Sequence, residues 1–398
     1  MKFLTSKWSS GDDDDDDDED DVDKVTDFLE ERELLVSPEK STVTLFTPDC
    51  HEAKIHPQIK IKNLLVPLEK HPRLLGVTFD TMHTFNQHAK LTASKASKKI
   101  NILKSLAGST WGQSKETLIL TYKSICRSVM EYAAVWAPVI SKSRWSDLQS
   151  VQNSALRIAT GSLLMTNIDH LHIETKVLPL EIHSKMITKQ YLASTHLPDH
   201  PGNKHLNRPQ PPRQMKLQKS MNIYTEEVTH RFREQEPTKQ DYKRVLKDIH
   251  TETVRKTIQQ YSENHVLGQA YNPPPPINPD EIKLTRIARS RLSQLRSGFS
   301  RLLNSYLNRL DDKIENKCPK CETTPHDTNH LFNCHANPTS LPTTSLWTHP
   351  IEASNFLGLE ELEDPDPGWS YNNNEMNRVS DEGAQSTGLK GSQHPSGV

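Results

Sequence analysis

Four residues near the C-terminus have the types and the spacing of a metal site. The segment 318–334 reads CPKCETTPHDTNHLFNC, in which Cys318, Cys321, His330 and Cys334 form the pattern C-x2-C-x8-H-x3-C. Three thiolates and one imidazole are a common donor set for tetrahedral Zn²⁺. A catalytic zinc ion usually keeps one position open for water, whereas four protein ligands leave none. The pattern therefore predicts a closed structural zinc site.

Two other histidines offer alternative ligands. His326 and His335 could each replace His330, but His330 leaves the short return to the last cysteine that is typical of a zinc knuckle. Leu331 and Phe332 follow directly, and they could either cover the site or stack on a nucleic-acid base. We predict His330 as the fourth ligand.

Basic residues surround an apolar helical face just before these cysteines. The face is formed by residues at helical spacing, with a break expected near Gly298: Leu284, Ala288, Leu292, Leu295, Phe299, Leu302, Tyr306 and Leu310. No acidic residue occurs from 282 to 310, and guanidinium groups match phosphate geometry. We predict Arg289, Arg296 and Arg301 as phosphate contacts, with a solvated helix surface as the alternative.

A second cationic helix is expected from Phe85. Its apolar face would contain Phe85, Ala89, Thr92, Ala96, Ile100, Leu103 and Ala107. Lys90, Lys95, Lys98 and Lys104 lie off that face, and no acidic residue occurs from 84 to 107. The pattern favours a polyanion as partner, although a row of charges also serves only to solvate a helix.

Three further helices are predicted between residues 114 and 197. The first begins after Ser114 as N-cap and places Leu118, Tyr122, Ile125, Val129 and Ala133 on one face. The second spans 144–160, ends at Gly161, and buries Trp145, Leu148, Val151, Ala155 and Ile158. The third spans 178–197 and places Leu180, His183, Ile187 and Tyr191 on one face. Arg157 lies off the apolar face of its helix and is a candidate phosphate contact, with an ordinary surface arginine as the alternative.

Before these helices, short β elements are expected. An amphipathic helix is predicted at 27–35, then a strand at 42–46, a strand or hairpin at 59–66, and a strand at 74–79. Gly76 interrupts the last strand and permits a bend or the close approach of another group.

Composition limits the class of protein. The 398 residues allow two or three domains, and the hydrophobic content of 33% is low for a chain that is packed throughout. Residues 12–23 contain eleven of the 51 acidic residues, so the rest of the chain holds 49 basic against 40 acidic residues. No apolar run approaches the roughly 20 residues that span a bilayer, and no signal-peptide core occurs. We expect an intracellular protein, nuclear or cytoplasmic, in which Cys50 and Cys126 are free thiols.

Several ordered blocks resemble one family. SPEKSTVTLFTPD, HPRLLGVTFD, KINILKSLAGSTWG and LILTYKSICRSVMEYAAVWAP resemble the end of the palm and the thumb of reverse transcriptases from jockey-like non-LTR retrotransposons. RLSQLRSGFSRLLNSYLNRL, the zinc pattern and SLWTHPIEASNFLGL resemble the C-terminal region of the same family. The resemblance implies that HPRLLGVTFD is a primer-grip hairpin and that the following helices hold a template–primer duplex.

The resemblance also implies a fold and a domain order. We expect an α+β, mainly α protein with these parts: 1–26, disordered acidic tail; 27–82, palm remnant with primer-grip-like strands; 83–197, helical thumb; 198–280, proline-rich linker with one helix near 242–261; 281–337, arginine-rich helix and zinc knuckle; 338–398, C-terminal tail. Intact relatives polymerise DNA on an RNA template with Mg²⁺ held by paired aspartates. Here the first catalytic aspartate is absent, and a flexible polyaspartate at 12–18 cannot fix a metal ion.

The sequence therefore predicts a truncated reverse transcriptase that retains nucleic-acid binding and does not polymerise alone. Expected partners are RNA, an RNA–DNA duplex and the missing polymerase half, and no membrane. One alternative is a recruited zinc-dependent RNA- or DNA-binding protein. The other is a non-functional pseudogene product.

Overall fold

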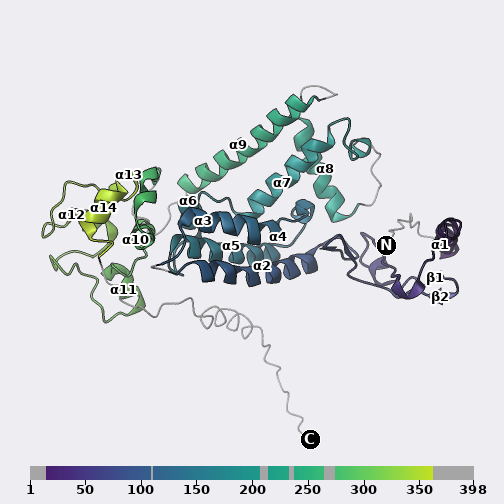
Figure 1. The fold of residues 1–398 in the computed structure, drawn as a ribbon, viewed down its shortest axis with the longest axis horizontal. Coiled ribbons are helices and arrows are strands. Elements are labelled where there is room, and N and C mark those ends of the chain that lie inside the picture. The colour runs from purple at the N-terminus through teal and green to yellow at the C-terminus, as the bar shows by residue number, and fades with distance from the viewer. Residues whose placement is uncertain (1–14, 109–110, 207–213, 233–236, 264–273, 362–398) are drawn as a thin grey trace, which may run out of the picture. The chain divides into compact units, whose positions relative to one another are not determined.

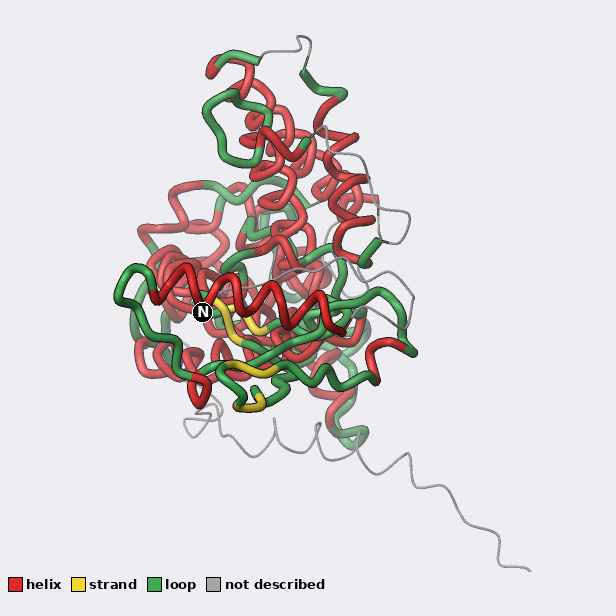
Figure 2. Tube along the Cα trace, turned by 90° about the vertical axis from the view of Figure 1, so that its right-hand side faces the viewer, coloured by secondary structure: helices red, strands yellow, loops and turns green. Residues whose placement is uncertain are grey.

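The computed structural model describes residues 15–108, 111–206, 214–232, 237–263 and 274–361, and within them it is mainly helical (Figures 1 and 2). The α+β, mainly α prediction is confirmed at that level. The chain divides into two compact units. Unit 1 comprises residues 1–99, 123–154 and 176–261, and unit 2 comprises 100–122, 155–175 and 262–398.

Two short antiparallel hairpins are the β structure of the described residues in unit 1. β1 (Lys60–Ile61) pairs with β2 (Leu64–Leu65), which confirms the hairpin predicted at 59–66. β3 (Arg73–Leu74) pairs with β4 (Val77–Thr78), so the single strand predicted at 74–79 is wrong: this segment contains the end of β3, a turn at residues 75 and 76, and β4. The strand predicted at 42–46 is wrong, because this segment makes only an isolated bridge to residue 68.

Gly76 has φ +88° and occupies the turn of the second hairpin. The Tyr132 ring lies against it, with Cε1 3.5 Å from the position that a Cβ would take, and the Tyr132 hydroxyl donates to the carbonyl oxygen of Leu75 at 2.9 Å. The expected close approach of another group to this glycine is therefore confirmed.

The N-terminal helix differs from the prediction. α1 spans Asp15–Glu30, so the expected disordered tail extends too far and the helix predicted at 27–35 is misplaced. Its buried apolar side chain Val22 packs with Ile61 and Val66. Residues 1–14, including part of the aspartate run, lie outside the described residues.

Helix α2 (Asn86–Leu106) confirms the predicted apolar face. All seven residues of that face are buried, since their exposed fractions do not exceed 4%: Phe85, Ala89, Thr92, Ala96, Ile100, Leu103 and Ala107. The unit boundary at residues 99 and 100 falls within this helix. The buried side of α2 is thus the side that the spacing of its apolar residues predicted.

The next helical segment begins as predicted and then changes register. In α3 (Lys115–Thr121), the Ser114 hydroxyl accepts from the Thr117 amide, which confirms the N-cap. A π-helical segment, η3 (Tyr122–Arg127), follows, and then α4 (Ser128–Met130). The wider turn places Cys126 and Met130 in the core instead of the predicted residues 125, 129 and 133, which are only half-buried or exposed.

Within the predicted linker at 198–280, the helix expected near 242–261 is confirmed, and a further helix that was not predicted lies before it. α7 (Leu180–Thr195), α8 (Lys216–Thr229) and α9 (Lys239–Glu263) share one hydrophobic cluster in unit 1 and are drawn side by side in Figure 1. The cluster consists of Met186, Leu192, Ala193, Val228, Val245 and Ile249. The face predicted for α7 is also misplaced, because Tyr191 is exposed and His183 is half-buried. His183 Nδ1 is hydrogen-bonded to Glu131 Oε1 at 2.6 Å.

Unit 2 is built around a core that extends past the zinc pattern. α10 (Arg286–Ser297) ends at Gly298 with φ +69°, as predicted, and α11 (Asn304–Leu310) follows. α13 (Ser345–Thr348) and α14 (Pro350–Leu357) contribute Leu346, Trp347 and Ala353 to the same core. The region predicted as a C-terminal tail is therefore folded up to residue 361, and residues 362–398 lie outside the described part.

The remaining elements are short or connect these parts. α5 (Lys142–Thr160) confirms its five predicted buried residues and ends at Gly161 with φ +70°. α6 (Ile168–Thr175) and α12 (Thr328–Asn333) belong to unit 2. The 3₁₀ turns are η1 (Pro38–Lys40), η2 (Glu52–Lys54), η4 (Ala134–Trp136), η5 (Asn203–His205) and η6 (Pro279–Lys283).

Candidate metal centre and basic surfaces

The four predicted zinc ligands come together in unit 2. One ligand atom from each of Cys318, Cys321, His330 and Cys334 lies within 4.8 Å of all the others. The Sγ atoms of Cys318 and Cys334 are 3.8 Å apart, and Cys321 Sγ is 3.3 Å from His330 Nε2. The ligand atoms of a tetrahedral zinc site lie about 3.5–3.8 Å apart. The cluster could therefore hold a zinc ion with closed coordination.

Local backbone hydrogen bonds place these ligands. The Cys318 amide donates to the Thr324 carbonyl oxygen at 2.9 Å, and the Glu322 amide donates back to the Cys318 carbonyl oxygen at 2.8 Å. Asp327 caps α12, because its carboxylate accepts from the His330 amide at 2.8 Å. The first two cysteines therefore lie on one tight turn, and the cap fixes the helix that presents His330.

The thiols differ in how readily they lose a proton. Hydrogen bonds from Thr323 and then Thr324 lower the pKa of Cys321 to about 4, so this sulfur is a thiolate at neutral pH. Burial, with the neighbouring Cys318 thiol, raises the pKa of Cys334. Because zinc binds thiolates, an ion at this centre would displace the Cys334 proton.

The two histidines considered as alternative ligands, His326 and His335, are not part of the four-residue cluster. His326 Nδ1 accepts from the Asn304 amide at 3.1 Å, so this ring holds the start of α11. His335 is exposed and is not part of the four-ligand cluster. The choice of His330 is therefore consistent with the geometry.

The base-stacking suggestion for Phe332 is wrong. Phe332 is 4% exposed and belongs to the unit 2 core, with its ring centroid 5.8 Å from that of Phe356. Leu331 is partly buried against the same core. Both residues support the metal loop from inside the unit.

The predicted arginine stripe on α10 is also wrong, because its acidic partners lie outside the stretch 282–310: Glu281 directly precedes it, and Glu116 and Glu174 are more than 100 positions away. Arg296 is fully buried and forms ion pairs with Glu174 (Nη1 to Oε1, 2.9 Å) and Glu281. It also donates to the Leu346 carbonyl oxygen at 2.6 and 2.9 Å. A guanidinium held in this way cannot contact a phosphate at the surface.

Arg289 is buried in the same region. Its side chain is 8% exposed and forms a bidentate pair with Glu116. Neighbouring Arg291 donates to the Leu359 carbonyl oxygen at 2.6 Å. The absence of acids from 282 to 310 therefore did not mean uncompensated charge.

A lysine from α3 completes this ion network. Lys115 Nζ is 2.9 Å from both Glu174 Oε1 and Glu281 Oε1. Burial opposes its charge, but the two carboxylates outweigh that cost and raise the pKa of Lys115. Burial likewise opposes ionisation of Glu174, yet Lys115 and Arg296 hold its pKa well below the usual range. Sequence reasoning missed this network because bonded members such as Lys115 and Glu281 lie 166 positions apart.

The lysine face of α2 differs from α10. Lys90, Lys95 and Lys98 are exposed, and no hydrogen bond or ion pair connects their side chains with another residue in the described part of the chain. Lys104 is half-buried and has an interaction within the chain. Three of the four predicted lysines thus form an open cationic surface in unit 1.

The other two basic candidates are half-buried. Arg157 Nη2 donates to the Thr166 carbonyl oxygen at 3.3 Å, so this side chain supports the turn after α5. Arg301 is half-buried beside Tyr306, whose phenol it influences electrostatically. Neither side chain is as accessible as the α2 lysines.

Comparisons with protein-family models, curated proteins and solved structures gave no match. None of the helices in the described ranges is both long and apolar enough to cross a membrane.

Proposed function

We propose that this chain binds nucleic acid, with RNA or an RNA–DNA duplex as its partner. The observation that carries the proposal is the open lysine surface of α2. Lys90, Lys95 and Lys98 are exposed on a 21-residue helix that contains no acidic side chain. Such a surface attracts a phosphate backbone and releases its counterions on binding.

The zinc cluster has a supporting role in this proposal. Four protein ligands leave no position for water, so the ion stabilises the fold of unit 2 and performs no hydrolysis. The order of these features along the chain is that expected for the thumb and C-terminal region of a jockey-like reverse transcriptase. We infer from this order and from the quoted blocks that the chain is related to that family.

Polymerase chemistry by this chain alone is not part of the proposal. Two Mg²⁺ ions require fixed paired carboxylates. Within the described residues, the group of three or more candidate metal ligands is the cysteine–histidine cluster, and it lacks carboxylates. A polymerase segment outside this sequence would have to supply the aspartates and their Mg²⁺.

A second candidate is a recruited zinc-dependent binding protein whose acidic segment regulates it. The eleven acids of residues 12–23 could compete with RNA for the lysines. Deleting residues 12–23 should then tighten RNA binding at low salt. Unchanged affinity would remove this candidate. Rapid degradation of the chain in cells would favour a non-functional product.

The decisive experiment compares two triple variants of equal charge change. Lys90→Gln, Lys95→Gln and Lys98→Gln remove the α2 surface, whereas Lys239→Gln, Lys243→Gln and Lys247→Gln change exposed lysines of α9. Binding to single-stranded RNA and to an RNA–DNA duplex is measured across a salt series. Removing one lysine–phosphate interaction lowers the slope of log K against log salt by roughly 0.7–0.9.

We expect the α2 variant to bind weakly with a slope reduced by about two. The α9 variant should resemble the unmodified chain, because acidic residues are interspersed along that helix. Equal reductions in the two variants, or no binding by the folded zinc-loaded chain, would refute the proposal.

A further inference from the structure

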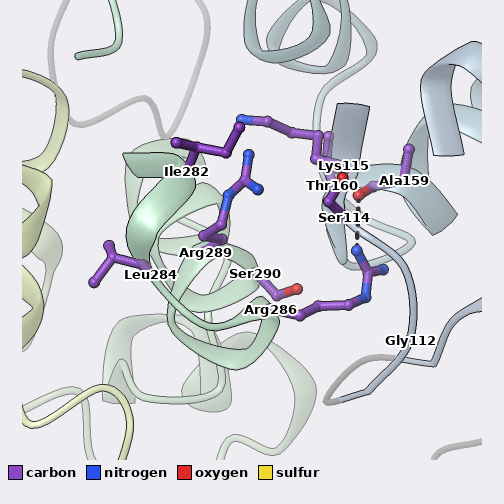
Figure 3. Close-up of a pocket in the computed structure, with 10 residues that line it drawn as sticks. All are labelled: Gly112, Ser114, Lys115, Ala159, Thr160, Ile282, Leu284, Arg286, Arg289 and Ser290. Carbon is purple, nitrogen blue, oxygen red and sulfur yellow. Dashed lines mark hydrogen bonds between the residues drawn. The ribbon is translucent and has the colours of Figure 1, made fainter. Parts of the chain in front are cut away.

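A small pocket in unit 2 is lined by cations and hydroxyl groups. Its volume is about 150 Å³, and its walls include Lys115, Arg286, Arg289, Ser114 and Ser290. Figure 3 shows the three α10 side chains on one side, with residues 114–115 and 159–160 opposite them. All of these residues belong to the same unit.

The described wall of this pocket carries positive charge without a carboxylate. Three of its residues are cations, Lys115, Arg286 and Arg289, and none of the ten is acidic. The carboxylates that pair with Lys115, on Glu174 and Glu281, are buried, whereas Glu116, which pairs with Arg289, is 50% exposed; none of the three lines the pocket. Because its lining contains three cations and no carboxylate, the pocket favours an anion.

One hydrogen-bond donor of Arg289, a lining residue, makes no hydrogen bond within the described part of the chain. Its two terminal nitrogens are bonded to Glu116. Its Nε is buried and makes no hydrogen bond among the described residues, although it forms an ion pair with Glu281 Oε1 at 3.6 Å. A buried donor without a partner is costly, so an acceptor in the pocket would be stabilised there.

A buried hydroxyl is also available to that anion. Ser290 is 3% exposed, and no hydrogen bond joins its hydroxyl to another residue that the structure describes. Because Ser290 lines the pocket, an anion there would accept a hydrogen bond that the protein does not otherwise use. A hydrogen bond to a charged acceptor is stronger than one between neutral groups.

The size of the pocket limits the anion. Sites for drug-sized ligands occupy about 300–1,000 Å³, so 150 Å³ suits one tetrahedral anion and no nucleoside. An exposed aromatic residue directly precedes one of the lining residues in the sequence. Trp111 is 58% exposed, precedes the lining residue Gly112, and packs its indole Nε1 against Gly108. Arg286 donates hydrogen bonds to the carbonyl oxygens of Gly108 and Gln113.

We propose that this pocket binds the phosphate group at the end of a nucleic-acid strand, while the terminal base stacks on Trp111. A phosphate within the strand would need room for a nucleoside on both sides, whereas a terminal phosphate needs it on one. The strand-end assignment rests on the proposed function, but phosphate binding by the pocket does not.

The test has two arms. First, the thermal stability of the full zinc-loaded chain is measured with inorganic phosphate and with chloride at equal ionic strength. Second, the affinity for one RNA sequence is compared with 5′-phosphate, 3′-phosphate and hydroxyl ends. Ser290→Ala removes the pocket hydroxyl, and Ser354→Ala is its control, since Ser354 is a buried, unpartnered serine of the same unit that does not line the pocket.

We expect phosphate to stabilise the chain and one phosphorylated end to bind about tenfold more tightly than the hydroxyl end. Ser290→Ala should reduce both effects, and Ser354→Ala should reduce neither. Trp111→Ala should weaken RNA binding without changing stabilisation by inorganic phosphate, because its ring contacts the base.

The outcomes separate the two proposals. Stabilisation by phosphate with no preference for either phosphorylated end would overturn the strand-end assignment and leave a site for free phosphate. If the unmodified chain is stabilised by phosphate but binds no RNA, the proposed function is overturned and, with it, the strand-end assignment. Absence of phosphate stabilisation, or an equal response in the two serine variants, would overturn the pocket itself.

Discussion

Replacing Arg296 by methionine tests the ion network most directly. Methionine keeps much of the length of the buried side chain but removes its charge. Among the described residues, Glu174 then keeps only Lys115, and Glu281 keeps Lys115 and, at 3.6 Å, Arg289. Breaking a buried pair on one side costs about 3–5 kcal/mol, because a charge is left uncompensated. Since Lys115 stays in place, we expect a cost at the lower end of that range, about 3 kcal/mol.

The matched control is an exposed ion pair in the same part of the chain. Lys283 pairs with Asp280 at 2.8 Å, with exposed fractions of 63% and 54% for their side chains. Lys283→Met should cost no more than about 1 kcal/mol, since solvent screens such pairs. Urea unfolding of the zinc-loaded chain compares the two variants. Hydrogen exchange of α10 amides reports unit 2 separately, which matters because the chain has two units.

The pH dependence supplies a second check on Arg296→Met. In the unmodified chain, the pKa of Glu174 is held below 4.5, so its stabilisation exists above pH 4.5 and is lost as pH falls through the lowered pKa. In the variant that pKa rises, and protonation relieves the uncompensated charge. The difference in unfolding free energy between the two proteins should therefore shrink as pH falls. A destabilisation below about 1 kcal/mol at pH 7, or a difference independent of pH, would refute the reasoning.

Three other perturbations test separate parts of unit 2. A chelator should lower the melting temperature, with a stability loss of several kcal/mol, and Cys318→Ser should behave like the chelated chain, whereas Cys50→Ser should not. Burial lowers the pKa of His170 to about 4, so unfolding free energy should decrease as pH falls from 6.5 towards 4, by up to about 3 kcal/mol; in His170→Phe the urea midpoint should lack this component. Gly161→Ala should cost about 2–4 kcal/mol, because φ is +70° and the new Cβ would lie 2.5 Å from a serine side chain of α10. Gly358→Ala, at φ +62° with open space around it, should cost only about 1 kcal/mol, and equal losses in thermal melts would contradict the packing argument.

The sequence alone determined local structure and the metal cluster. The apolar spacing of α2 and α5 predicted their buried faces, and Ser114 and Gly161 marked helix ends, because caps and amphipathic faces depend on residues a few positions apart. The zinc ligands were found for the same reason, since all four lie within 17 consecutive residues.

Two other features could not be predicted from local sequence: the register of the buried residues after residue 122, and the extent of helix packing between residues 198 and 280. The π-helical turn at residues 122–127 shifts the buried row to Cys126, and no residue in that segment signals the wider turn. Residues 198–280 looked like a linker because prolines dominate their ends. The helix predicted near 242–261 is present as α9, whereas α8 was not predicted. Contacts with α7 stabilise both helices, and a local reading of composition does not include those contacts.

Only the tertiary structure decided which basic residues are free to bind. Arg296 and Lys95 both lie in stretches without acids, so their local sequences predict the same cationic surface. Folding brings Glu174 and Glu281 to Arg296 and leaves Lys95 exposed. The difference arises because ion pairs form through space between segments far apart in the chain, whereas the spacing of charges along one helix reports only that helix.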